Sequence, residues 1–253
     1  MIDPSQPKIL GRVGLSVYAT SVPGQVIQAR PDRGVLAGGL LYVTLGSLSA
    51  SPSFSFAGPG RVVIVDPATD TVSGMVDLPD QTGCSGIDYR ADTNRLYVSC
   101  GGEFSDGDQQ VARSALVEID LGGAAPTVGR ILRASALGTQ PFSYHAPIVV
   151  GDTALAVTTG AFDPTTNAML VPDTAYAAPF DGSAPIKLLD GGAFNLGRPA
   201  ADAPRTTIFL PDGNAVTPRV RTLDVRAAPW VAGPAAFEPD PVGHLPPREA
   251  VGY

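Results

Sequence analysis

The sequence is poor in the residues that many catalytic and metal centres use. Its 253 residues include two histidines, two cysteines and two lysines, so a centre with several histidine ligands is hard to build. It contains no Gly-x-Ser-x-Gly elbow, no His-Glu-x-x-His pair and no phosphate-binding loop. No window approaches the ~18 consecutive apolar residues that a transmembrane helix needs. The sequence therefore carries no signature of these enzyme classes and predicts no membrane span.

Concentrated positive charge is also missing. The net charge is −7, and the arginines are scattered along the chain without a basic stripe. We therefore expect no nucleic-acid binding, and we interpret the acidic balance as a contribution to solubility. Residues 1–10 lack the basic and apolar regions of a signal peptide. This leaves two alternatives, a cytosolic protein or a mature or truncated piece of an exported one.

One phrase occurs four times in the sequence. It reads Leu-Tyr-Val-Thr-Leu-Gly at 41–46, Leu-Tyr-Val-Ser-Cys-Gly at 96–101, Leu-Ala-Val-Thr-Thr-Gly at 155–160 and Ile-Phe-Leu-Pro-Asp-Gly at 208–213. A short apolar run that ends in aspartate follows each copy, as at 61–66 and 115–120. A period near 50 residues with several short strands in each unit is typical of a β-propeller.

The second repeat shows the predicted blade. We expect strands at 84–90, 95–100, 114–120 and 127–132, with a tight turn at 91–94. The 29 glycines and 25 prolines are well above the usual ~12% of residues and suit many turns between short strands. The predicted fold is all-β, a propeller of four-stranded antiparallel blades.

The same order of strands predicts a single propeller domain over residues 1–232. A half blade at 11–30, with strands at 14–20 and 25–28, precedes whole blades at 34–78, 83–133, 144–190 and 193–232. A proline-rich tail is expected at 233–253. The tail, missing upstream blades or a second chain would be needed to close the ring. We favour missing upstream sequence, because the half blade has no signal peptide before it.

The repeated phrases resemble the YVTN family of β-propeller repeats. Tyr42-Val43-Thr44 and Tyr97-Val98-Ser99 carry the match, together with Asp66-Pro-Ala-Thr-Asp-Thr-Val72 at the turn between the third and fourth strands. The resemblance covers about residues 34–133, and Leu45, Cys100 and Thr159 stand where the family has asparagine. The family includes bacterial surface and secreted proteins, and lactonase-like and quinoprotein-like propellers are related to it. The resemblance implies the fold and export, without a reaction.

Long insertions separate the second and third strands of three repeats, at 47–60, 102–113 and 161–173. Such insertions lie on one face of a propeller, beside the starts of the inner strands, and commonly form its binding face. Packing over one another as a lid is the alternative. The candidate binding residues are Arg33, Phe54, Phe56, Phe104, His145, Phe162 and Asn195.

Two features of this face allow a metal or catalysis. Glu103, Asp106 and Asp108 supply carboxylates in a glycine-containing loop, so calcium is a possible ligand, although their spacing does not match the twelve-residue calcium loop. A solvated acidic loop is the alternative. His145 near the channel is a candidate base or ligand, or a hydrogen-bonded structural histidine. No cofactor is predicted from the residues.

The two cysteines are expected to form a disulfide. Cys84 opens one strand of the second repeat and Cys100 closes its hairpin partner, within about one residue of register. A disulfide would indicate an oxidising compartment, and two buried free thiols are the alternative.

These observations favour an extracytoplasmic, non-catalytic propeller, periplasmic, secreted or on the cell surface, that binds a protein or glycan through its insertions. One alternative is a lactonase-like hydrolase with a divalent cation at the central channel. The other is a structural propeller that forms homo-oligomers through an exposed blade edge.

Overall fold

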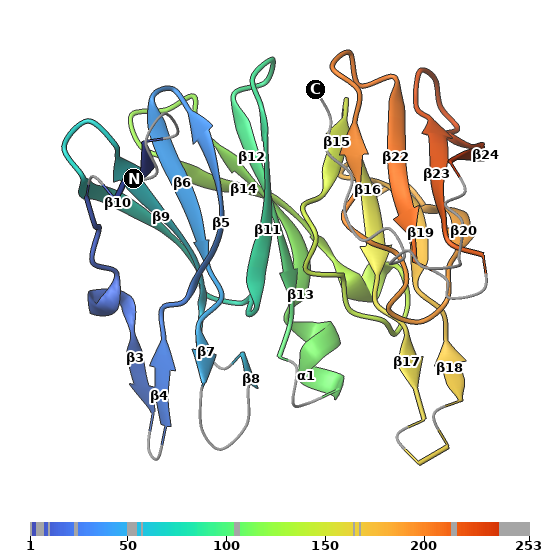
Figure 1. Cartoon of the computed structure of the whole chain (residues 1–253), viewed down its shortest axis with the longest axis horizontal. Helices are drawn as coiled ribbons and strands as arrows, with labels where there is room; N and C mark the ends of the chain where they lie inside the picture. Colours follow the sequence, from blue (N-terminus) through green and yellow to red (C-terminus); the bar gives the residue numbers. More distant parts are fainter. Residues whose placement is uncertain are drawn as a thin grey trace.

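The structure is a computed structural model and describes residues 2–3, 8–9, 11–22, 25–49, 55–56, 58–103, 107–163, 165–166, 168–213 and 217–237. This part of the chain is nearly all β-structure, with one short α-helix, α1 (Gly107–Ala112), and the 3₁₀ turns η1 (Ser16–Tyr18) and η2 (Ala134–Ala136). Four of its sheets are antiparallel, four-stranded and successive in the chain, as propeller blades are (Figure 1). The predicted propeller fold is confirmed.

Each blade runs from an inner to an outer strand. Blade 1 contains β5 (Pro31–Ala37), β6 (Leu40–Leu45), β9 (Gly60–Asp66) and β10 (Thr71–Leu78). Blade 2 contains β11 (Cys84–Arg90), β12 (Arg95–Gly101), β13 (Ser114–Asp120) and β14 (Thr127–Arg133). Blade 3 contains β15 (Ile148–Val150), β16 (Thr153–Thr158), β19 (Thr174–Pro179) and β20 (Ile186–Asp190). Blade 4 contains β21 (Ala200–Ala201), β22 (Thr207–Asp212), β23 (Arg219–Asp224) and β24 (Val231–Phe237).

Local sequence sets the hairpin turns of the blades. Gly38 and Gly39 join β5 to β6, both with positive φ (56° and 82°), as a type I′ turn requires. Asn94, with φ of 51°, ends the turn between β11 and β12, where an asparagine tolerates the left-handed conformation. These turns fix the register in which the repeated phrase pairs with the strand before it.

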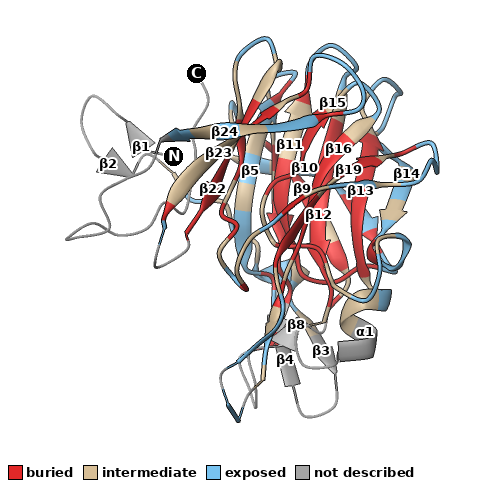
Figure 2. Ribbon diagram, turned by 90° about the vertical axis from the view of Figure 1, so that its right-hand side faces the viewer, coloured by how far each residue is buried: buried red, intermediate tan, exposed pale blue. Residues whose placement is uncertain are grey.

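Apolar side chains fill the space between successive blades. Tyr42, Val62 and Ile64 of blade 1 belong to one buried cluster with Val98 and Val117 of blade 2. Comparable clusters join blade 2 to blade 3 and blade 3 to blade 4. Figure 2 shows this burial along the central strands. Both faces of β9 and β13 are buried, so these strands read as nearly continuous apolar runs.

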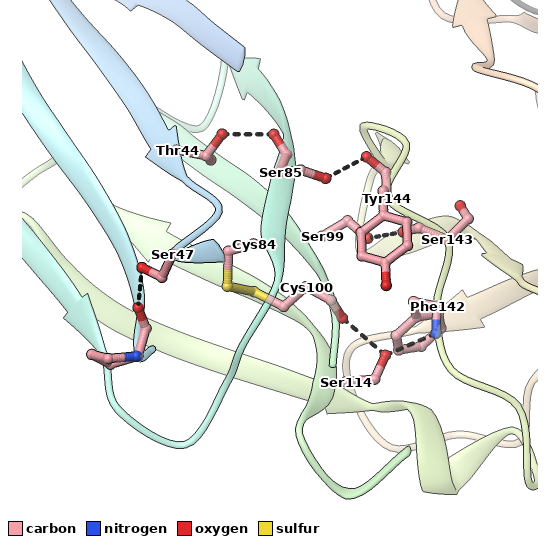
Figure 3. Close-up of a disulfide and its surroundings, with 11 residues drawn as sticks. Thr44, Ser47, Cys84, Ser85, Ser99, Cys100, Ser114, Phe142, Ser143 and Tyr144 are labelled. Carbon is pink, nitrogen blue, oxygen red and sulfur yellow. Dashed lines mark hydrogen bonds between the residues drawn. A yellow bond between two sulfur atoms is a disulfide. The ribbon is translucent and has the colours of Figure 1, made fainter. Parts of the chain in front are cut away.

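Hydroxyl groups connect the blades inside this apolar core (Figure 3). The fourth position of the repeated phrase is Thr44 in blade 1, and its Oγ1 donates to the Ser85 carbonyl of blade 2 (2.7 Å). The same position is Ser99 in blade 2, and its Oγ donates to the Ser143 carbonyl on the segment that enters blade 3 (2.6 Å). Ser85 Oγ also donates to the Tyr144 carbonyl (2.7 Å). Each bond satisfies a polar group that the junction buries.

The predicted disulfide is confirmed. Cys84 and Cys100 are cross-strand partners in β11 and β12, and their sulfur atoms are bonded (Figure 3). A Cβ atom at Gly60 would lie 2.3 Å from Cys84 Sγ, so glycine allows β9 of blade 1 to pass close to the disulfide. The disulfide therefore lies at the junction of blades 1 and 2.

The three predicted insertions project from the same end of the blades (Figure 1). In blade 1 the insertion forms β7 (Leu48–Ser49) and β8 (Ser55–Phe56). In blade 2 it contains α1, and in blade 3 it forms β17 (Ala161–Phe162) and β18 (Met169–Val171). The expectation that the insertions share one face is confirmed.

Of the two strands expected for a half blade at residues 11–30, the one at 25–28 is present as β4 (Gln25–Gln28). Residues 16–18 form a 3₁₀ turn, and β3 (Thr20–Val22) and β4 (Gln25–Gln28) join the blade 1 insertion in a sheet of order β3-β4-β7-β8. Val13, Leu15 and Tyr18 instead pack on the face of blade 1 that points away from blade 2. Arg61 donates to the Tyr18 carbonyl (2.9 Å) and holds this cover in place. A preceding blade would have to pack on this same face of blade 1.

The remaining strands lie near the chain ends. β1 (Ile2–Asp3) pairs with β2 (Lys8–Ile9). β24 continues to Phe237, so the tail expected from residue 233 begins inside a strand that pairs with β23. Residues 238–253 lie outside the described part. In that part, no helix is long and apolar enough to cross a membrane.

An ion pair joins blade 4 to blade 2. Arg205, on the turn before β22, donates to both carboxylate oxygens of Asp88 on β11 (2.9 and 3.1 Å). It also donates to the Val149 carbonyl of blade 3 (3.2 Å), which accepts from Arg90 as well (2.6 Å). Burial raises the pKa of the Asp88 carboxyl, and Arg205 opposes that rise. Arg205 therefore links a turn of blade 4 to the inner strands of blades 2 and 3.

Replacing Arg205 by alanine is expected to lower the free energy of unfolding by about 2–4 kcal/mol, because Asp88 would keep a largely buried charge without its main partner. Urea unfolding measures the loss. The control is Arg226→Ala, whose pair with Asp224 is exposed and should contribute far less. Equal losses in the two variants would contradict the role of Arg205.

Reducing the disulfide is expected to lower the free energy of unfolding by about 3 kcal/mol, because the closed loop spans a sequence separation of 16. Urea unfolding with and without reductant measures the difference. A Cys84→Ser/Cys100→Ser double variant is the control and should not respond to reductant. An unchanged parent would show that the disulfide adds no stability.

Candidate functional site

The blade 3 insertion is a short hairpin with a defined base and tip. Ala161 pairs with Val171, and Phe162 pairs with Met169. At the tip, Asp163 Oδ1 accepts from the N–H groups of Thr165 (2.7 Å) and Thr166 (3.0 Å), which lower the pKa of its carboxyl. At the base, a Cβ atom at Gly160 would lie 2.4 Å from the Val171 carbonyl oxygen, so glycine allows the two strands to meet. The hairpin is therefore held at both ends.

This hairpin carries an exposed apolar surface. Phe162 stacks on Phe194, from the loop between β20 and β21, with ring centroids 5.8 Å apart and an interplanar angle of 24°. The side chains involved are 37–62% exposed. We call this surface the hairpin patch, and it consists of Phe162, Met169, Leu170, Val171 and Phe194. A contiguous apolar patch on a soluble domain commonly marks an interaction site.

Asp173 joins the hairpin to the loop that carries Phe194. Its Oδ1 accepts from the N–H groups of Gly160 (2.6 Å) and Phe194 (2.9 Å). Its Oδ2 accepts from the N–H groups of Asn195 (2.7 Å) and Leu196 (2.8 Å). Burial raises the pKa of the Asp173 carboxyl, and the four N–H groups oppose that rise. Asp173 therefore positions Phe194 beside Phe162, and its oxygens are occupied by the backbone.

A pocket of about 140 Å³ opens beside Phe194. It lies at the junction of blades 3 and 4 and contains hydroxyl, imidazole and apolar groups. Its lining residues are Ser143, Tyr144, His145, Thr159, Asp173, Phe194 and Leu196. Gln140 supports one wall, because its Nε2 donates to the carbonyls of Pro172 (2.7 Å) and Thr159 (3.2 Å). The pocket and the hairpin patch share Phe194 and form one candidate site.

Tyr144 connects this site to the blade 2 insertion. Its ring packs against Gly101 of blade 2. A Cβ atom at position 101 would lie 2.2 Å from Tyr144 Cε1, so glycine makes room for the ring. Burial raises the pKa of the Tyr144 hydroxyl to about 12, and Gln110 of α1 opposes that rise. Tyr144 therefore stays protonated at neutral pH and can donate or accept a hydrogen bond.

The structure brings together three of the predicted binding residues. His145 lines the pocket, Phe162 is part of the hairpin patch, and Asn195 follows Phe194 on the same loop. Arg33 lies on β5 of blade 1, where its N–H and carbonyl groups both bond to Thr44 Oγ1 (3.3 and 3.1 Å). It is not among the residues that line this pocket.

Several predicted residues lie outside the described part of the chain. These are Phe54, Phe104 and Asp106, and the side chains of Phe56 and Asp108 are not described either. Glu103 follows β12 and is partly exposed. Among the residues that are described, no three His, Cys, Asp or Glu side chains form a group suited to a metal ion. The calcium site at Glu103, Asp106 and Asp108 stays a prediction.

Sequence reasoning missed Phe194, Asp173 and the apolar strand Met169–Val171. The signal for Phe194 is an aromatic residue in the glycine-rich stretch Gly191-Gly192-Ala193-Phe194. The signal for Asp173 is its place just before the third strand of its blade. Ser114, the first residue of the third strand of blade 2, also bonds to the next junction, where it accepts from the Phe142 N–H (2.8 Å).

Comparison with known proteins finds structural similarity at low sequence identity. No family model matches the sequence, and no curated protein matches it. Similar solved structures include a prolyl endopeptidase (13% identity, 81% of this chain and 26% of that one, TM-score 0.47). A nidogen/laminin complex is also similar (16% identity, 77% of this chain and 64% of that one, TM-score 0.41). So is hydrazine synthase of Kuenenia stuttgartiensis (14% identity, 83% of this chain and 59% of that one, TM-score 0.49). This chain spans less than two thirds of each of these chains.

Replacing Asp173 by alanine is expected to lower the free energy of unfolding by about 3 kcal/mol or more, because four backbone N–H groups lose their acceptor. Chemical denaturation measures this loss. The control is Asp181→Ala, which removes an exposed turn carboxylate that accepts from Ser183 N–H and should destabilise the protein far less. Similar losses would mean that Asp173 is only another turn residue.

Proposed function

We propose that this chain is a non-catalytic binding module that acts outside the cytoplasm and binds a protein partner through the hairpin patch. The observation that carries the proposal is the exposed apolar surface of the patch, beside a pocket with polar groups. This combination of an apolar centre and a polar border is common in protein-binding sites.

The composition of the patch favours a protein over a glycan. Sugars stack on aromatic rings, and the stacked pair of Phe162 and Phe194 would suit them. Met169, Leu170 and Val171 extend the exposed surface with aliphatic side chains, which gain most from apolar protein groups. A methionine also adapts its shape to a partner.

The carboxylates near the site support binding rather than hydrolysis. Asp173 is bonded to four N–H groups. Asp212, the cross-strand partner of Leu196, accepts from Arg219 (3.1 Å) and Arg221 (3.0 Å) through one oxygen. A general base must reach the proton that it removes. Both Asp173 oxygens are bonded to the backbone, and Asp212 Oδ1, which has no hydrogen-bond partner in the described part of the chain, is buried. The disulfide supports an oxidising, extracytoplasmic compartment.

Changing Phe162 and Leu170 to serine is expected to leave the fold intact and weaken partner binding at least tenfold, because both side chains are exposed in the free protein. Peptides from a random display library would be selected on the parent chain and then measured by calorimetry. Their affinity for the double variant is compared with that for the parent.

The matched control is Val231→Ser, which removes an exposed apolar side chain from β24 of blade 4. It should bind the selected peptides as the parent does. Equal affinity for the parent and the double variant would place the binding surface elsewhere and contradict the proposal. Native mass spectra of the same samples test whether two copies associate through a blade edge instead.

A further inference from the structure

The junction of blades 2 and 3 shows how a tyrosine of the repeated phrase is normally buried. Tyr97 is the second residue of the phrase, and its cross-strand partner is Glu118. The Tyr97 hydroxyl bonds to Glu118 Oε2 (3.3 Å), and Arg130 donates to the same oxygen (2.6 Å). Phe180 of blade 3 packs on Tyr97 with ring centroids 5.5 Å apart, and Arg130 lies 5.4 Å from the Phe180 ring. A carboxylate, a guanidinium and a ring thus fill this junction.

The junction of blades 1 and 2 has the same backbone without these three groups. Tyr42 is the equivalent tyrosine, and its cross-strand partner is Ile64 in place of a glutamate. Ile64 pairs with Gly74, which stands where blade 2 has Arg130. Leu121 takes the place of Phe180, because Leu121 N–H bonds to the Asn94 carbonyl (3.1 Å) as Phe180 N–H bonds to the Asp152 carbonyl (2.9 Å).

A pocket of about 270 Å³ lies in this junction, at the end of the blades opposite the insertions. Its walls combine apolar side chains with polar backbone groups of the turns and the Asn94 amide. The lining residues are Ala37, Gly38, Leu40, Tyr42, Asn94, Leu121, Gly123, Ala124 and Pro126. An engineered cavity of about 150 Å³ in another protein accommodates benzene, so this volume is sufficient for a substituted ring.

The Tyr42 hydroxyl has no partner in the described part of the chain. Tyr42 is only 5% exposed and lines the pocket, yet no hydrogen bond joins its hydroxyl to a described residue. The Tyr42 hydroxyl therefore faces the pocket and its solvent, whereas the Tyr97 hydroxyl bonds to Glu118 inside the protein. Burial and the nearby Tyr89 raise the pKa of Tyr42, so its hydroxyl stays protonated and can donate.

We propose that this pocket binds a small neutral molecule with an apolar ring and one oxygen that bonds to the Tyr42 hydroxyl. The ring occupies the space that Phe180 fills in the next junction. The oxygen replaces the acceptor that Glu118 provides there. The molecule is neutral because Gly74 stands at the position of Arg130, so a buried carboxylate would lack its counter-charge. This site is separate from the hairpin patch and does not depend on its function.

The test uses 4-methylphenol as the probe, with binding measured by calorimetry on the full chain. The parent is expected to bind one equivalent with a dissociation constant of about 0.1–1 mM, as befits a ligand of this size. Tyr42→Phe keeps the ring, loses no hydrogen bond within the described protein and should weaken binding about tenfold. Leu121→Phe supplies the ring of the next junction and should abolish binding.

Tyr97→Phe is the matched control at the equivalent repeat position. It should lower stability, because Glu118 loses a hydrogen bond, and leave 4-methylphenol binding unchanged. Toluene should bind at least tenfold more weakly than 4-methylphenol, and 4-methylbenzoate should not bind. The proposal is overturned if the parent shows no saturable binding up to about 10 mM, or if Leu121→Phe binds as the parent does. Equal affinity for toluene would overturn the role of Tyr42.

Discussion

The burial of both faces of the central strands is the constraint on which this structure depends. β9 and β13 are apolar on both sides, so a blade alone would expose one or two apolar faces to water. Each blade is therefore stable only against a neighbour, as in other repeat architectures. The polar groups that this packing buries need partners within the junctions, and the hydroxyl groups of Thr44, Ser85 and Ser99 supply them. Blade 1 meets the same constraint on its other face with Val13, Leu15 and Tyr18 instead of another sheet.

Much of the fold could be predicted because the repeated phrase encodes the blade directly. Apolar alternation, turn residues and the aspartates that end the third strands specify local pairing, and they placed the strands of blade 2 and the disulfide. Residues 11–19 show what such patterns leave open. Alternating burial of Val13 and Leu15 indicates an extended segment with one apolar side. The pattern is the same whether that side belongs to a strand within a sheet or to a segment that lies across the face of one. Only the distant contact with Val63 and Val65 decides between them.

The candidate site was predictable in its place and only partly in its residues. Insertion length indicates the end of the blades at which the candidate site lies, since a connection of more than ten residues between paired strands must project from the sheet. Phe162 and His145 followed from that position. Phe194 and Asp173 did not, because they are 21 residues apart and meet only through N–H bonds across the junction of blades 3 and 4. A buried aspartate that accepts four amide bonds has no local pattern, since its partners come from two loops.

Both sites lie where two blades meet, and the packing of the junctions explains why. Strand pairing needs backbone groups and tolerates many side chains, so exchanging a glutamate for Ile64 or an arginine for Gly74 keeps the sheet of blade 1 in register. These exchanges leave the junction of blades 1 and 2 without the groups that fill the junction of blades 2 and 3. Different residues of the repeat therefore maintain the stack of blades and fill the junctions between them. Its inward hydroxyls and apolar runs maintain the stack of blades, while the residues beside Tyr42 and Tyr97 determine whether a junction is closed by the protein or left open for a ligand.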